Sequence, residues 1–126
     1  MITFEQSVTE PDAFGLAEER FDPSGVVITV RGELDIATAP QLRERMSAAI
    51  DEGVRRVVID LRPLDFLDSV AVASMLHARR QLGDAGRLAV VVAPDSYIRM
   101  VFEIAGLPDC LDVVETRDEA VALVGC

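Results

Sequence analysis

Residues 26–42 read VVITVRGELDIATAPQL. The first part of this stretch favours a strand, the last part favours a helix, and only a short turn separates them. The run Val26–Arg31 is rich in β-branched residues, which favour a strand because they pack well on a pleated surface. Thr38 then stands at the position of a helix N-cap, and Pro40 fits the first helical turn. The stretch therefore predicts a strand followed directly by a helix, which is the repeating unit of an α/β fold.

The segment before this stretch predicts an antiparallel partner strand. Residues 22–25 read DPSG, with proline and glycine at the positions that a β-turn favours. The weakly apolar run Phe14–Phe21 precedes that turn, so the two runs should form an N-terminal β-hairpin. Residues 1–12 are polar and mixed, and we expect a flexible lead-in or an edge strand there. A single domain is therefore predicted over residues 13–126.

The segment after this stretch repeats the strand–helix unit. Apolar runs predict buried strands at Val57–Leu61 and Arg87–Ala93 and a short last strand at Leu111–Val114, with residues 62–67 as a loop. Helical spacing and capping residues predict helices that begin near Thr38, Asp68, Ser96 and Thr116. The predicted fold is α/β: a mixed, mostly parallel sheet of four to five strands, packed with four helices.

The expected core is aliphatic, because the aromatic share is only 5%. Val70 and Val72 are ambiguous, since one of them should face the core and the other the surface. The remaining core prediction comprises Val26, Ile28, Val30, Val58, Ile59, Leu61, Leu88, Val90, Val92, Val101 and Phe102.

Composition excludes several classes of function. The formal net charge is −10, so nucleic acid and anionic membrane surfaces are poor partners. All 12 basic residues are arginines, which removes lysine-dependent chemistry. Cys110 and Cys126 are too few for a disulfide framework, and no apolar run is long enough to insert into a membrane. The N-terminal residues do not resemble a signal peptide, so we expect a cytoplasmic protein.

Functional crevices of open α/β sheets lie beyond the carboxyl ends of the strands. Three loops should meet there: residues 32–37, 62–69 and 94–96. They would bring polar side chains to one edge, namely Glu33, Asp35, Asp65, Asp68, Ser69, Asp95 and Ser96.

These residue types do not form a familiar catalytic set. The carboxylates lack metal-ligand spacing, and acidic residues at helix starts are explained by capping. Ser69 has no base in reach, since the single histidine, His77, lies about 12 Å further along the same helix. An aspartyl-phosphate receiver would need a lysine. We therefore predict no enzymatic activity, no metal and no cofactor, and we expect protein docking at this edge.

Several motifs together are similar to those of the STAS domain, the family of bacterial anti-sigma factor antagonists. The residues that carry the resemblance are GELDIATAPQL at 32–42, VVIDL at 57–61, LDFLDS at 64–69, VFEIAGL at 101–107 and DEA at 118–120. The resemblance implies a STAS-type fold over about residues 14–125. It also implies binding to an anti-sigma factor, a protein kinase of the histidine-kinase-like ATPase type, which frees a sigma factor. In that family the kinase phosphorylates the antagonist and the complex separates.

The chain departs from the family at the phosphorylation motif. The family run is Asp-Ser-Ser/Thr-Gly, with phosphate on the second hydroxyl residue, whereas residues 68–71 here read DSVA. Val70 occupies the acceptor position and has no hydroxyl. Ser69 is a candidate substitute, but a shift of one residue turns a helical side chain by about 100°. The departure predicts an antagonist that stays competent to bind, without the standard serine switch.

The resemblance implies a partner interface around the start of the second helix. We expect it to contain Glu33, Asp35, Asp65, Asp68, Ser69, Val70 and Val72. Two other functions stay open: a STAS scaffold or transporter-associated regulatory subunit, and a small nucleotide-binding protein. Against the nucleotide-binding function, the sequence has no glycine-rich phosphate loop. The sequence leaves the oligomeric state open.

Overall fold

The computed structural model describes residues 3–4, 14–106 and 111–125. Its elements are β1 (Thr3–Phe4), β2 (Gly15–Asp22), β3 (Gly25–Leu34), α1 (Ala39–Asp51), β4 (Arg56–Asp60), β5 (Leu64–Leu67), α2 (Ser69–Leu82), β6 (Arg87–Val91), α3 (Tyr97–Ile104), β7 (Asp112–Val114) and α4 (Arg117–Val124). Both cysteines lie outside the described residues. In the lead-in, Thr3–Phe4 forms an edge strand on β2, and the other residues before Phe14 lie outside the described part.

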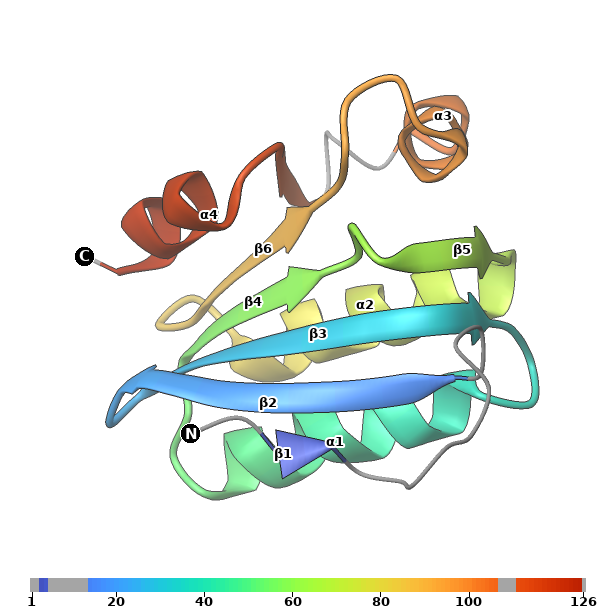
Figure 1. The fold of residues 1–126 in the computed structure, drawn as a ribbon. Coiled ribbons are helices and arrows are strands. Elements are labelled where there is room, and N and C mark those ends of the chain that lie inside the picture. The colour runs from blue at the N-terminus through green and yellow to red at the C-terminus, as the bar shows by residue number, and fades with distance from the viewer. Residues whose placement is uncertain (1–2, 5–13, 107–110, 126) are drawn as a thin grey trace.

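The strands form one mixed sheet in the order β1-β2-β3-β4-β6-β7, with β5 added to β3 (Figure 1). The pairs β1–β2 and β2–β3 are antiparallel, and the remaining pairs are parallel. The predicted α/β class, mostly parallel sheet, N-terminal hairpin and four helices are confirmed. The described residues contain seven strands, more than the four to five that the sequence predicts.

Alternate residues of the central strands face two different helical layers. Val26, Ile28 and Val30 of β3 belong to the core cluster that α1 and α2 cover. Val27, between them, belongs to a second cluster that is closed by Ala120 and Val124 of α4. The sheet therefore has α1 and α2 on one face and α4 on the other (Figure 1). Every predicted core residue is buried except Val101, which is half-buried.

The prediction of a loop over residues 62–67 is wrong, because Leu64–Leu67 forms β5. β3 continues to Leu34, beyond the end of its pairing with β4, and its free edge there pairs in parallel with β5. Gly32 has a φ of 88°, a conformation that glycine adopts readily, and the strand register shifts between Gly32 and Glu33. β5 thus lies beside the last residues of β3 and leads directly into α2.

An ion pair between the buried Asp60 and the exposed Arg62 holds the turn between β4 and β5, which both run parallel to β3. Asp60 is only 3% exposed, and Arg62 donates to both of its carboxylate oxygens, from Nε to Oδ1 at 2.9 Å and from Nη2 to Oδ2 at 2.7 Å. The backbone N–H of Arg62 also donates to Oδ1 at 3.1 Å. The side-chain bonds to Asp60 raise the pKa of the Arg62 guanidinium. The chain therefore leaves the carboxyl end of β4 in one defined geometry and continues into β5 in the same direction along β3.

Candidate functional site

The loop after β3 is ordered by its own side chains. Asp35 Oδ1 accepts hydrogen bonds from the backbone N–H groups of Ala37 and Thr38, at 2.9 and 3.1 Å. Thr38 occupies the N-cap position of α1, as predicted, but its hydroxyl makes no capping bond to the helix. It donates instead to Glu33 O at 2.7 Å and accepts from the Asp35 N–H at 2.9 Å. Asp35 therefore holds the turn that leads into α1.

Asp68 caps the start of α2 and joins it to the loop after β3. Its Oδ1 accepts from the backbone N–H groups of Val70 and Ala71, at 3.0 and 3.3 Å. Its own backbone N–H donates to Leu34 O at 3.2 Å. The end of β3 and the start of α2 are thus adjacent, as the sequence reasoning expected from a parallel sheet. The first free N–H groups of the helix are already occupied by the Asp68 carboxylate.

The two ambiguous valines of α2 have opposite environments. Val70 is 39% exposed, whereas Val72 is 8% exposed and belongs to the main core cluster. Ser69, the first residue of the helix, is exposed. Val72 is the core member of the pair, so its side chain offers little to a partner, contrary to its place in the predicted interface.

We call the surface around these two joined segments the rim. Glu33 of β3 and Asp65 of β5 are exposed on it. Asp35 and Asp68 are half-buried, and their carboxylate oxygens accept hydrogen bonds from backbone N–H groups. Ile36 adds an apolar side chain that is 72% exposed. The rim consists of Glu33, Asp35, Ile36, Asp65, Asp68, Ser69 and Val70.

The third predicted loop lies beside β5. Ser96 caps α3, since its Oγ accepts from the Arg99 N–H at 3.1 Å and donates to Ala93 O at 2.7 Å. α3 contacts β5, and the rings of Phe66 and Tyr97 stack with centroids 6.4 Å apart. Asp95 is exposed at the start of α3 and has a φ of 59°. The loop thus adjoins the rim through β5.

Sequence reasoning missed most of the exposed apolar side chains of this end of the molecule. It took α3 as a buried stripe of Ile98, Val101, Phe102 and Ala105. Ile98 and Phe102 are buried, but Ala105 is exposed. The available signal was the second apolar set on the same helix, spaced by three and four residues. The missed exposed side chains are Ile36, Phe66, Tyr97, Met100 and Ile104.

The site holds no familiar catalytic geometry. His77 is half-buried two turns along α2 from Ser69. Among residues 3–4, 14–106 and 111–125, no three His, Cys, Asp or Glu side chains are grouped so that they could hold a metal ion. None of the helices in the same ranges has the length and apolar character needed to cross a bilayer. The rim offers the exposed apolar side chains Ile36 and Val70 together with the exposed carboxylates of Glu33 and Asp65.

The family model that matches this chain is that of the STAS domain, over residues 17–120. Among curated proteins, the chain is 36% identical over 94 residues to the anti-sigma F factor antagonist of Lysinibacillus sphaericus. That match covers 73% of this chain and 80% of the relative.

Solved structures of anti-sigma factor antagonists have the same fold. One from Mycobacterium paratuberculosis has a TM-score of 0.83 at 28% identity, over 94% of this chain and 100% of that one. SpoIIAA in its unphosphorylated form has a TM-score of 0.71 at 33% identity, over 86% and 93% of the two chains. A phosphorylated form of Bacillus SpoIIAA has a TM-score of 0.62 at 32% identity, over 87% and 97%.

Proposed function

The chain belongs to the STAS domain family, and we propose that it is an anti-sigma factor antagonist that binds an anti-sigma factor and thereby releases a sigma factor. The names of its relatives support the antagonist function. The observation that carries the proposal is the hydrogen bond from Asp68 N–H to Leu34 O, which makes one continuous surface of the two loops. The partner is a protein kinase of the histidine-kinase-like ATPase type, and sigma factors act in the cytoplasm, where we place the complex.

The rim binds the partner in this proposal. Val70 is its apolar centre, and the exposed Glu33 and Asp65 at its margin select for basic groups on the anti-sigma factor. Ser69 adds a hydroxyl beside Val70. The same carboxylates disfavour a nucleoside triphosphate, and binding alone requires no catalytic group. The folded unit that carries the rim is one domain over residues 13–126.

The regulation that we propose depends on Val70. SpoIIAA exists in unphosphorylated and phosphorylated forms. At the family's acceptor position this chain has two methyl groups in place of a hydroxyl, so the partner kinase has no oxygen to phosphorylate there. A phosphate dianion at that position would separate the complex, because it would lose its hydration in an apolar contact and would be repelled by the neighbouring Asp68 carboxylate. Without that modification the antagonist stays bound while ATP is present.

The proposal is tested by calorimetric titration of the purified chain into an anti-sigma factor kinase from the same organism. Val70→Glu places a charge at the apolar centre, and we expect binding to weaken by roughly a hundredfold or more, as at an interface hot spot. The matched control is Leu123→Glu, because Leu123 is also 39% exposed but lies on α4. Equal affinity for the wild type and Val70→Glu would remove the rim as the docking surface.

A further inference from the structure

α3 is apolar on two sides, and only one of them faces the core. Ile98 and Phe102 are buried in the main cluster. Tyr97, Met100 and Ile104, spaced by three and four residues, form a second stripe, with exposed fractions of 49%, 50% and 80%. We call this set the α3 stripe. A row of large apolar side chains left in water along a helix is typical of a surface that another protein covers.

The α3 stripe continues the apolar part of the rim. Tyr97 stacks on Phe66, whose backbone pairs with Glu33 of the rim. β5 then leads through Leu67 and Asp68 into the helix turn that carries Val70. Figure 1 shows α3 above β5, at the end of the sheet where β3 and β5 finish and α2 begins. A partner that covers the start of α2 therefore lies next to β5, whose Phe66 stacks with Tyr97, the first residue of the stripe.

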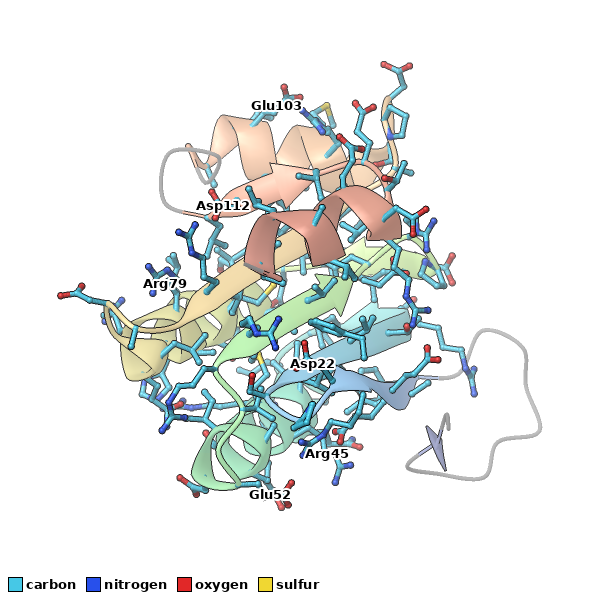
Figure 2. All side chains as sticks on the ribbon, turned by 90° about the vertical axis from the view of Figure 1, so that its left-hand side faces the viewer. Asp22, Arg45, Glu52, Arg79, Glu103 and Asp112 are labelled. Carbon is cyan, nitrogen blue, oxygen red and sulfur yellow. The ribbon has the colours of Figure 1, made fainter. Side chains whose placement is uncertain are left out.

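An acidic pocket of about 600 Å³ lies beside the stripe and shares Tyr97 and Met100 with it. Asp95, Glu103 and Glu115 supply three carboxylates to its lining. Among the described residues of the lining, Arg99 is the one with a basic side chain, and its Nη1 lies 3.7 Å from Glu115 Oε2. Figure 2 shows Glu103 on the outer side of α3, directed away from the sheet. The pocket therefore combines apolar walls with a net negative charge.

We propose that α3 is the second half of the docking surface, and that it takes an apolar segment of the anti-sigma factor flanked by an arginine or lysine. The stripe covers the apolar groups and the acidic pocket takes the basic side chain, whose aliphatic stem packs on Tyr97 and Met100. This inference rests on the proposed function, because it assigns a second contact of the same partner.

Charge favours this partner over a second copy of the chain. The whole chain has a formal net charge of −10, and the exposed carboxylates of Asp95 and Glu103 line the same pocket as Tyr97 and Met100 of the stripe. Two copies joined through the stripe would bring these carboxylates together in a region of low dielectric, where like charges repel strongly. A partner with basic groups around an apolar patch meets attraction at the same positions.

The apolar contact is tested with Met100→Glu and Ile104→Glu, titrated by calorimetry into the anti-sigma factor that binds the wild type. We expect each to weaken binding by roughly tenfold or more, as for apolar contacts inside an interface. Leu123→Glu introduces the same side chain at an exposed leucine on α4 and should leave the affinity unchanged. Thermal melts that match the wild type within error show that the variants are folded.

The acidic contact is tested with Glu103→Arg, measured by stopped-flow association at increasing salt. The variant should associate more slowly than the wild type and depend less on salt, because electrostatic steering is lost. Asp84→Arg makes the same charge change at the exposed turn between α2 and β6, and should associate like the wild type.

Each outcome decides the inference. If Met100→Glu and Ile104→Glu bind the anti-sigma factor with the same affinity as the wild type, the α3 contact is overturned and the rim is left intact. A wild type that binds no anti-sigma factor kinase of its organism overturns the proposed function and this inference with it. Sedimentation that finds a dimer of the free chain, broken by Ile104→Glu, assigns the stripe to a second copy and overturns the inference. Loss in both α3 variants, with Leu123→Glu unaffected, supports it.

Discussion

The backbone N–H of Asp68 donates to the carbonyl oxygen of Leu34, with an N···O distance of 3.2 Å. This bond joins the first residue before α2 to the last residue of β3, so two loops more than thirty positions apart become one surface. Val70, exposed just beyond the bond, is the residue on which the proposed regulation of this chain depends.

Restoring a hydroxyl at position 70 should restore phosphorylation. We expect the partner kinase and ATP to phosphorylate Val70→Ser, because the side chain at position 70 is exposed at the start of α2. The wild type and Ser69→Ala should both stay unmodified under the same conditions. Intact-mass spectrometry with peptide mapping measures the outcome. Stoichiometric phosphoserine at Ser69 of the wild type would contradict the proposal that this chain lacks the switch.

Asp35 should contribute to stability as well as to the surface. Its carboxylate accepts two backbone N–H groups, so Asp35→Ala should lower the free energy of unfolding by about 1 kcal/mol, like a lost helix cap. Asp35→Asn keeps an acceptor oxygen and should stay closer to the wild type. Urea unfolding measures the difference. An Asp35→Ala variant as stable as the wild type would show that these bonds contribute nothing to the turn.

Glu33 is the cleaner probe of charge on the rim, because its side chain is exposed. Glu33→Arg should weaken binding to the anti-sigma factor by on the order of 1 kcal/mol, which is roughly fivefold. Its thermal melt should match that of the wild type. Calorimetry against Asp84→Arg as the control separates a local effect from the change in net charge. If both variants weaken binding equally, only net charge is involved.

The Asp60–Arg62 pair should stabilise the turn that leads from β4 into β5. Arg62→Ala leaves a carboxylate that is 3% exposed without its two side-chain donors. We expect a loss on the order of 1–3 kcal/mol in the free energy of unfolding, measured in urea. Arg80→Ala removes an exposed arginine of α2 and serves as the control. A loss no greater than that of the control would mean that water replaces the guanidinium without cost.

Stability on the acid side should depend on Glu19, which contacts Arg117 and so ties β2 to α4. The hydrogen bond and then the charge of Arg117 hold the pKa of Glu19 below its usual value of 4.5. Because this pKa is lowered in the folded state, the ion pair contributes to the stability of the fold above pH 4.5. That contribution is lost as the pH falls through the lowered value. Glu19→Gln should therefore reduce the Tm at neutral pH and differ less from the wild type in acid. A difference that is constant across the pH range would contradict this linkage.

The strand and helix elements were predictable where side-chain pattern alone determines them. β-branched runs mark β3, β4 and β6, and the Thr116 cap is confirmed by its bond from Glu119 N–H at 3.1 Å. β5 was not predictable in the same way. The middle two of its four residues are both exposed, so the alternation of buried and exposed residues that marks a strand is absent. Its existence depends on a free edge of β3, which is a tertiary feature.

The location of the candidate site was predictable, and the roles of its individual residues were less so. Parallel topology brings the loops after β3 and β5 together, as the sequence indicated. Which of Val70 and Val72 faces the core depends on the phase of α2, and that is set by the position of its Asp68 cap. The roles of Asp35 and Thr38 depend on competing hydrogen bonds of similar strength, which pattern cannot rank. The α3 stripe was hidden because the buried stripe on the same helix explained its apolar content.

The most direct test of the account is release of a sigma factor from its complex with the anti-sigma factor kinase, followed by fluorescence anisotropy of the labelled sigma factor. Added wild-type chain should release the sigma factor, and the release should persist in the presence of ATP. Val70→Ser should release it only transiently, until it is phosphorylated. Failure of the wild type to release the sigma factor, or release that decays with ATP as in Val70→Ser, would contradict the account.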